Sequence, residues 1–208
     1  MPATLDDVPQ GHYGAILVDP PWRFEVWKEG SGRNVSAKYN TMTTAEIMRL
    51  PVRDLAAPNC ALFLWMVWPR LPDALRVIDA WGFVYKTCAF SWIKAHAGQL
   101  EMFRDDGDTL MGSGFWTRAN SEACLLATRG RPRRQSMAVR QAIIEPRREH
   151  SRKPDCVYER IERLIAGPYL ELFARQRRSG WDCWGDEVGK FAANGFAAHE
   201  QLALALPA

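Results

Sequence analysis

Short runs of apolar, mostly β-branched or aromatic residues alternate along the chain with longer stretches of mixed polarity. Where apolar residues recur at helical spacing, the pattern predicts helices from Thr43 or Thr44 to Leu50, over Pro72–Trp81 and over Asp155–Ala166. The continuous apolar runs predict buried strands at Gly14–Asp19, Cys60–Trp68, Phe83–Lys94, Glu122–Thr128 and Tyr169–Ala174. Strands that alternate with helices predict an α/β fold, a mostly parallel sheet flanked by helices.

Two long polar stretches interrupt this alternation. Arg23–Thr41 contains two glycines and is expected to be a mobile loop that can act as a lid, and Ala95–Gly114 is a second long excursion. At 208 residues the chain is expected to form a single domain, residues 1–208. A short lead, residues 1–12, precedes it, and an Ala-rich tail from about 190 to 208 is expected to form a helix with a loose end.

The composition is that of a globular protein, with 47% hydrophobic and 25% charged residues. It excludes a disordered, collagen-like or coiled-coil chain. The longest apolar run is far shorter than the roughly 20 residues that cross a bilayer, and the first residues do not resemble a secretory signal. The cysteines lie far apart without any C-x-x-C pair, which predicts no structural metal and a cytoplasmic location.

Positive charge is concentrated in one tract, Arg129–Lys153, which holds nine basic and two acidic residues although the whole chain carries only +3. Such a local excess predicts contact with a polyanion such as nucleic acid. A solvated basic surface is the alternative interpretation. The residues assigned to the nucleic-acid path are Arg131, Arg133, Arg134, Arg147 and Arg148.

The most informative segment is Asp19-Pro20-Pro21-Trp22, directly after a predicted strand. The exocyclic amine of a nucleobase is a poor nucleophile because its lone pair is delocalised into the ring. A carboxylate and a Pro-Pro backbone carbonyl that each accept one N–H would pull the nitrogen towards tetrahedral geometry, and an aromatic ring would stack on the flipped base. The plain alternative is a diproline turn with Trp22 packed in the core.

Several segments, in order, resemble the MT-A-seventy family, the adenine N6-methyltransferases that include the messenger-RNA adenosine methyltransferase and prokaryotic DNA relatives. Order and spacing agree from about Gly14 to Glu187. The matching segments are Asp19-Pro20-Pro21-Trp22; Tyr39-Asn40-Thr41-Met42; Leu62-Phe63-Leu64-Trp65; Asn120-Ser121-Glu122 with Cys124-Leu125; Lys153-Pro154-Asp155; and Glu171-Leu172-Phe173-Ala174-Arg175 with Trp184-Gly185.

The resemblance implies S-adenosylmethionine as methyl donor and a Rossmann-like sheet in which the catalytic motif precedes the cofactor region. It places Tyr39 on a gate loop beside the target adenine and the carboxylate of Glu122 in the same pocket. It places Lys153 on a second gate loop, between base and cofactor. Asp19, Pro20, Pro21 and Trp22 are then the catalytic residues, and Asp19 also contacts the cofactor.

The remaining cofactor contacts are implied late in the chain. Glu171, at a strand end, suits the diol of a ribose, and Arg175 suits a carboxylate. A surface ion pair is the alternative for each. Asp186 and Glu187 are assigned to the cofactor ribose, although the family commonly has Asn where Asp186 stands.

Nine tryptophans provide further candidates for base stacking. Trp65 and Trp68 fall in a predicted buried strand and are expected in the core. Trp22, Trp27 and Trp116 fall in predicted loops that a base could reach.

The sequence therefore predicts an adenine N6-methyltransferase that uses S-adenosylmethionine and acts on nucleic acid. DNA is favoured over RNA because the chain is compact and lacks the zinc-finger extension of eukaryotic relatives. Cytosine N4 methylation is disfavoured, because such enzymes usually carry Ser in place of Asp19. The alternative is a non-catalytic partner subunit that binds nucleic acid. The sequence is compatible with a homodimer and with a complex that contains a partner subunit. No membrane contact is expected.

Overall fold

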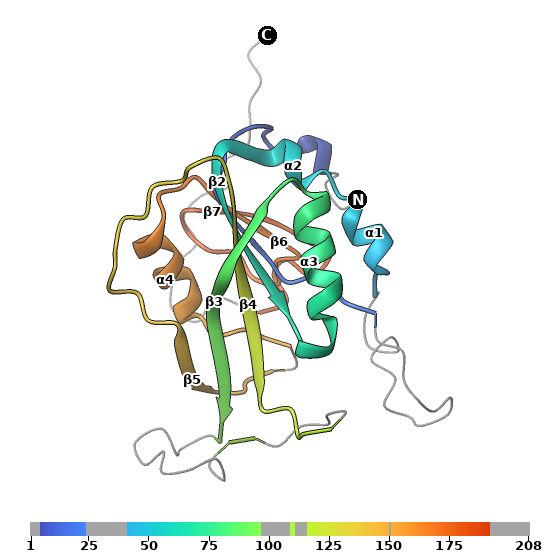
Figure 1. Ribbon diagram of the computed structural model, residues 1–208, viewed down its shortest axis with the longest axis vertical. Coiled ribbons are helices and arrows are strands. Elements are labelled where there is room, and N and C mark those ends of the chain that lie inside the picture. The colour runs from blue at the N-terminus through green and yellow to red at the C-terminus, as the bar shows by residue number, and fades with distance from the viewer. Residues whose placement is uncertain (1–4, 24–40, 97–108, 111–115, 150, 192–208) are drawn as a thin grey trace.

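The computed structural model describes residues 5–23, 41–96, 109–110, 116–149 and 151–191. Within this part of the chain seven strands form one sheet in the order β5-β3-β4-β2-β1-β6-β7 (Figure 1). The strands are β1 (Tyr13–Val18), β2 (Ala56–Met66), β3 (Val84–Ala95), β4 (Ser121–Arg129), β5 (Ala142–Pro146), β6 (Tyr169–Leu172) and β7 (Trp181–Trp184).

The sheet is mostly parallel, as the sequence predicts. β1 pairs in parallel with β2 and β6, β6 with β7, and β3 with β5, whereas β4 runs antiparallel between β2 and β3. The carboxyl end of the sheet is therefore where β1, β2, β3 and β6 end and where β4 begins. The opposite side, where β1, β2 and β6 begin and β4 ends, is the amino end.

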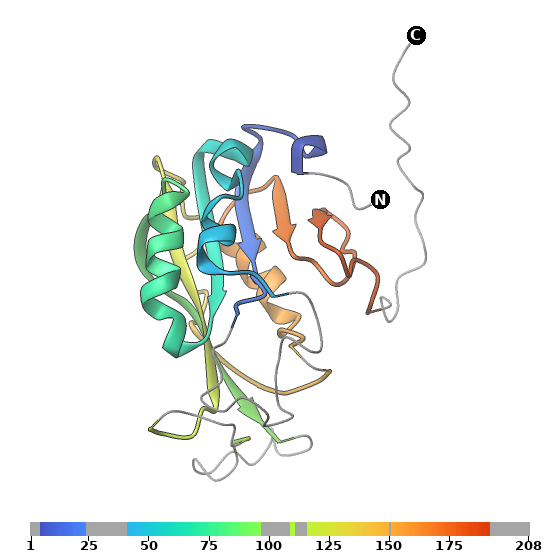
Figure 2. The same ribbon diagram turned by 90° about the vertical axis from the view of Figure 1, so that its right-hand side faces the viewer.

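Helices cover both faces of the sheet (Figure 2). They are α1 (Thr44–Met48), α2 (Val52–Leu55), α3 (Leu71–Ala80) and α4 (Cys156–Leu164), with short 3₁₀ turns η1 (Leu5–Asp7) and η3 (Trp68–Arg70). Successive strand residues point to opposite faces. Ile16 and Val18 thus pack on the α3 side, while Leu17 and Trp65 pack on the α4 side. This alternation produces two apolar layers, one on each face.

The predicted helices are present with small shifts at their ends. Thr43 caps α1 through a reciprocal bond pair: its hydroxyl accepts from the Glu46 amide at 3.2 Å, and its own amide donates to the Glu46 carboxylate at 2.7 Å. None of the described helices is long and apolar enough to cross a membrane.

Two strands were not predicted, and both are short. β5 lies inside the basic tract, where Arg147 and Arg148 follow the end of the strand directly, and β7 lies in a segment for which no element was predicted. The strand predicted over Cys60–Trp68 ends two residues earlier, at Met66, so that Trp68 lies in the turn beyond it. The lead before Leu5, most of both predicted loops and the Ala-rich tail lie outside the described residues.

Candidate active site

Asp19 stands at the carboxyl end of the sheet because β1 stops at Val18 and Pro20 and Pro21 have no amide hydrogen with which to continue the ladder. The chain turns at once, and the Trp22 amide donates to the Pro20 carbonyl at 2.8 Å. The Pro21 carbonyl accepts from the Met42 amide, also at 2.8 Å. The Pro20 oxygen keeps a second lone pair, as any carbonyl does.

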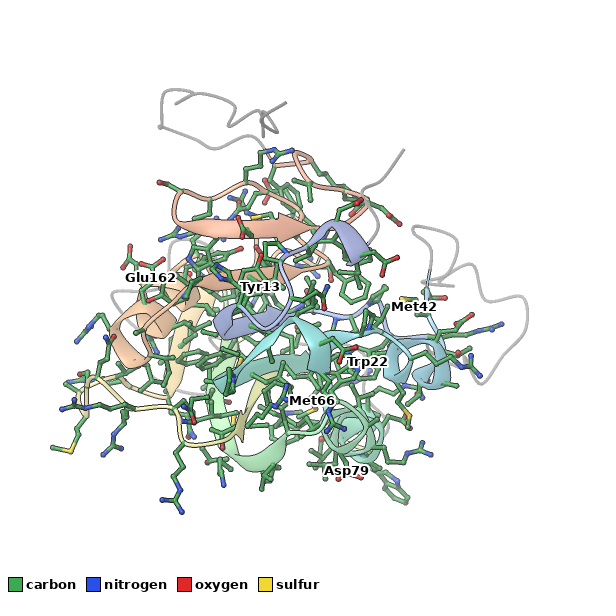
Figure 3. The ribbon with its side chains drawn as sticks, turned by 90° about the horizontal axis from the view of Figure 1, so that it is seen from above. Tyr13, Trp22, Met42, Met66, Asp79 and Glu162 are labelled. Carbon is green, nitrogen blue, oxygen red and sulfur yellow. The ribbon has the colours of Figure 1, made fainter. Side chains whose placement is uncertain are left out.

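Trp22 does not occupy the place expected for it. Its side chain is 5% exposed and packs in the core on the α3 side, where Figure 3 shows it between Met42 and Met66. Its Nε1 donates to the carbonyl of Trp65 at 3.0 Å. The packed alternative therefore describes Trp22 in this structure, and its stacking on a base stays a prediction. Trp22 anchors the loop that carries Asp19.

Four charged side chains meet at this end of the sheet. The Lys153 ammonium lies 2.7 Å from a carboxylate oxygen of Asp19 and 3.3 Å from one of Glu122. Lys94 pairs with the other oxygen of Glu122. The four side chains are only 15–23% exposed, and two positive charges balance two negative ones. The structure thus brings together Asp19, Glu122 and Lys153, as the sequence predicts, and adds Lys94.

The pKa values follow from this mutual pairing. Burial disfavours ionisation of Glu122, but the ammoniums of Lys153 and Lys94 outweigh it and lower the pKa of Glu122 to about 2. Burial alone would lower the pKa of Lys153, yet the carboxylates of Asp19 and Glu122 raise it. For Asp19 burial raises the pKa, and the Lys153 ammonium offsets this only in part. Lys153 is therefore a permanent cation, whereas Asp19 is the more easily protonated carboxylate.

Lys94 was missed because it ends an apolar strand and matches no motif. The register of β3 and β4 pairs Trp92 with Glu122, so Lys94 stands two residues beyond that pair, within reach of the carboxylate. The sequence carries no signal for this contact, because it shows neither that β3 and β4 are antiparallel nor in which register they pair.

Arg148 holds the loop of Lys153 in place. Its guanidinium donates to the Lys153 carbonyl at 2.9 Å and to the Asp155 carboxylate at 2.6 Å. Both bonds hold the backbone beside the Lys153 ammonium. Arg148 is still exposed, so its assignment to the nucleic-acid path stays a prediction.

A pocket extends from this charge cluster along β6 towards the turn after β7. Its lining comes from β1, β2, β6, α4 and the loops beside them. Two of its lining residues, Ser151 and Phe173, hold left-handed backbone conformations with φ of 62° and 61°. Non-glycine residues in that region cost of order 1 kcal/mol and concentrate at functional sites. The lining residues are Leu17, Asp19, Trp65, Ser151, Arg152, Lys153, Pro154, Val157, Tyr158, Glu171, Phe173, Arg175, Gln176 and Phe191.

Glu171 is the buried carboxyl group of this pocket. It is 9% exposed, and the Tyr158 hydroxyl lies 3.0 Å from each of its oxygens. Burial raises the pKa of Glu171 to about 8, and the Tyr158 hydrogen bond opposes that shift without cancelling it. The predicted placement of Glu171 in the pocket stands, while its role as a ribose ligand stays a prediction.

Arg175 lines the pocket but is already paired. Its Nε donates to Glu187 at 2.8 Å, and its guanidinium lies 4.8 Å from the ring centre of Phe191. Arg175 and Glu187 therefore form an ion pair, which was the alternative interpretation of Arg175. Asp186 is exposed, and neither it nor Glu187 is among the lining residues. The assignment of Asp186 and Glu187 to the cofactor ribose therefore stays a prediction.

Two buried nitrogen donors without a partner, Trp65 Nε1 and Arg152 Nε, both belong to residues that line the pocket; no other buried side-chain donor or acceptor of the described residues is left unsatisfied. An unsatisfied buried donor is costly, so such groups signal a ligand with acceptor atoms. S-adenosylmethionine offers a carboxylate and ribose hydroxyls, and the pocket therefore fits it. Arg152 was not singled out from the sequence.

The basic tract does not form one surface. β4 ends at the amino end of the sheet, so Arg131, Arg133 and Arg134, which follow it, begin there, and Arg134 bridges to Ile165. The chain then returns along β5, which is parallel to β3, and this brings Arg147 to the carboxyl end. The five arginines assigned to the nucleic-acid path therefore lie at two ends of the sheet, with the exposed Arg147 and Arg148 at the carboxyl end, and their contact with nucleic acid stays a prediction. Tyr39 and Trp27 lie outside the described residues.

The family model for MT-A70 matches residues 13–187, which includes every described strand of the sheet. The chain belongs to the MT-A70 family. The match begins at the start of β1 and ends at Glu187, so it covers the charge cluster and nearly all of the pocket lining.

Three MT-A70 relatives illustrate the range of the family. Type II methyltransferase M.MunI from Mycoplasma sp is 31% identical over 207 residues, covering 88% of this chain and 83% of its own length. The N(6)-adenosine-methyltransferase catalytic subunit METTL3 of Homo sapiens is 27% identical, and the N(6)-adenine-specific methyltransferase METTL4 of Homo sapiens is 29% identical. Each match covers 86% of this chain but only 28% of METTL3 and 38% of METTL4.

Proposed function

We propose that this MT-A70 protein transfers the methyl group of S-adenosylmethionine to the N6 amine of adenine in DNA. The observation that carries the proposal is the pairing of Asp19 with Lys153, both in the lining of a pocket with two unsatisfied donors. Family membership supports the reaction, because its relatives include the N(6)-adenosine-methyltransferase catalytic subunit METTL3 and the N(6)-adenine-specific methyltransferase METTL4. We also expect the protein to act in the cytoplasm, like a bacterial type II methyltransferase.

The chain's own groups account for activation of the amine. The Asp19 carboxylate accepts one N–H of the adenine amine and the free lone pair of the Pro20 carbonyl accepts the other, which directs the nitrogen lone pair outward. The methyl group comes from the sulfonium centre of S-adenosylmethionine, whose positive charge makes it electrophilic. After transfer the amine carries an extra proton, which Asp19 can accept because burial raises its pKa. The protein thus supplies alignment, a dry pocket and a nearby base.

The rest of the pocket suits the cofactor's polar groups. Lys153 and the unsatisfied donors of Trp65 and Arg152 suit the carboxylate and hydroxyl oxygens, and Glu171 suits a ribose diol. Arg175 would reach the cofactor while held by Glu187, which makes Glu187 a positioning residue. Tyr39 remains a proposed contact of the adenine.

DNA is proposed over RNA because of the share of each relative's own length that its match to this chain covers. M.MunI, a type II methyltransferase, is matched over 83% of its length, whereas METTL3 is matched over 28%. The test is methyl incorporation from labelled S-adenosylmethionine into single-stranded DNA, duplex DNA and RNA of one sequence, side by side. Incorporation confined to RNA would overturn the substrate, and no incorporation together with no cofactor binding would support the partner-subunit alternative.

A further inference from the structure

The feature that the reaction leaves unexplained is Trp68. The sequence predicts it in the core, yet its side chain is 48% exposed in the turn η3 beyond β2. Trp22, by contrast, was expected to be accessible and is buried. The two tryptophans have thus exchanged their expected environments, and an exposed indole stands at the carboxyl end of the sheet.

Trp68 is held in one orientation. Met66 pairs with Ala123, so the continued register sets Trp68 opposite Ser121, and the Trp68 Nε1 donates to the Ser121 hydroxyl at 3.1 Å. Because its only donor is used, the indole offers a partner nothing but its ring surface. An exposed ring that is already fixed also loses little conformational entropy when something stacks on it.

Two contacts tie this turn to the catalytic residues. Ser121 directly precedes Glu122, which binds both Lys94 and Lys153. On the other side Arg70, in the same turn, donates to the Arg23 carbonyl, next to the Asp-Pro-Pro-Trp loop. Trp68 therefore lies between the two segments that carry the acidic groups of the site.

The spacing suits a nucleotide a few positions away from the target adenine. Asp19 follows Val18, which pairs with Leu64, so it lies level with Trp65. Trp68 is three residues farther along, about 10 Å at the rise of an extended chain. That is about three nucleotides of stacked strand at roughly 3.4 Å each. The exposed Arg23 supplies positive charge on the same side.

We propose that Trp68 is a stacking subsite for a nucleobase that flanks the target adenine. This inference rests on the proposed function, because it assumes a polynucleotide substrate. It adds a residue that reads the strand beside the adenine without a hydrogen bond, and so tolerates any base with an aromatic face.

The test measures how the effect of a protein variant on binding depends on which nucleotide of the substrate lacks its base. Labelled oligodeoxynucleotides carry an abasic site at each position within four nucleotides of the adenine, and their dissociation constants are measured with S-adenosylhomocysteine present. For the wild type, one flanking abasic position is expected to weaken binding by about 5- to 150-fold, the range of base–aromatic stacking. Trp68→Ala is expected to weaken binding of the intact strand by the same factor and to lose all sensitivity to that position, whereas Trp68→Phe retains part of both.

The matched control is Tyr85→Ala. Tyr85 is 44% exposed, much like Trp68, but lies near the amino end of the sheet, where it pairs with Ala127. It is expected to leave every dissociation constant unchanged. If abasic sites weaken binding of the wild type and of Trp68→Ala equally, Trp68 is not a stacking subsite. The same conclusion follows if Trp68→Ala loses self-association while its dissociation constants depend on no single base. Methyl incorporation by the wild type into the intact strand is measured in parallel, so failure of the proposed function is seen separately.

Discussion

The Tyr158 hydroxyl lies 3.0 Å from both oxygens of Glu171, inside the pocket assigned to the cofactor. One hydroxyl can donate only one proton, so this contact cannot fully replace the water that the carboxylate loses on burial. The pKa of Glu171 consequently stays at about 8. Near neutral pH the group is largely protonated before a ligand arrives.

The first prediction is a pH dependence of cofactor binding. If ribose hydroxyls donate to Glu171, binding favours the carboxylate, so affinity must increase as pH rises from about 6 towards 8, by up to about tenfold per pH unit. Titration calorimetry with S-adenosylhomocysteine measures this slope. Glu171→Gln, which cannot ionise, is expected to bind with a flat profile. A slope that persists in the glutamine variant would show that another group takes up the proton.

Loss of Asp19 is expected to affect turnover more than binding. Asp19→Ala removes the group that orients the amine, and one preorganised contact at a reacting centre is worth about 100-fold or more in rate. Single-turnover methylation at saturating cofactor measures this loss. Asp54→Ala, which removes an exposed carboxylate in α2, is the control expected to keep the wild-type rate. A near-wild-type rate for Asp19→Ala would remove Asp19 from the mechanism.

Glu122 makes the protein sensitive to acid. Because its folded pKa is lowered to about 2, its contribution to stability is complete above pH 4.5, the ordinary pKa, and is lost as pH falls towards 2. At about 1.4 kcal/mol per pH unit the loss amounts to about 3 kcal/mol. Urea unfolding between pH 2 and 7 is expected to show this loss in the wild type and a smaller one in Glu122→Gln. That variant should also be less stable at pH 7, since it leaves Lys94 and Lys153 with one partner fewer.

Glu159→Gln is the control for that series, because Glu159 is exposed on α4 and pairs with neither lysine. Its acid profile is expected to match the wild type. If Glu122→Gln lost as much stability in acid as the wild type, the loss would not come from the Glu122 carboxylate that the two lysines hold ionised.

The basic residues are expected to separate into two groups. Each phosphate contact contributes about −0.9 to the slope of log affinity against log salt concentration. Arg147→Ala, at the carboxyl end of the sheet, should flatten this slope by about one unit for duplex DNA. Arg133→Ala with Arg134→Ala, which follow β4 at the amino end, should leave it unchanged. A flatter slope for the double variant would mean that nucleic acid also contacts the amino end.

The fold could be predicted from the sequence because its buried strands are continuous apolar runs of the kind that parallel sheets require. The charge cluster could be predicted in part, since Asp19, Glu122 and Lys153 all fall next to strand or helix ends. Lys94 could not, because its role depends on the register of β3 against β4, which the sequence does not state. Nor could the bonds that Arg148 makes to Asp155 and to the Lys153 carbonyl.

The tryptophans illustrate why exposure was harder to predict than secondary structure. Trp68 continues an apolar run, but β2 stops at Met66 and the next residues turn outward. Trp22 follows two prolines and resembles a loop residue, yet the Met42 backbone and the Trp65 carbonyl hold it against the core. For Trp22 the decisive neighbours, Met42 and Trp65, are distant in sequence, and for Trp68 the apolar run does not show where β2 ends.

The antiparallel placement of β4 has a consequence for the length of the segment that precedes it. β3 leaves the sheet and β4 returns to it at the same end, with Trp92 and Glu122 paired across the gap. The closure entropy of such an excursion grows only slowly with its length, by about 0.6 kcal/mol per doubling. The length of the excursion between Lys94 and Ser121, 26 residues in this chain, is therefore only weakly constrained by the pairing of β3 with β4. Its attachment is more specific, because the Lys94 amide donates to the Asn120 carbonyl at 3.0 Å and the Lys94 carbonyl accepts from the Leu110 amide at 2.7 Å. A change of length leaves Lys94 in its place in the charge cluster only where these two bonds are kept.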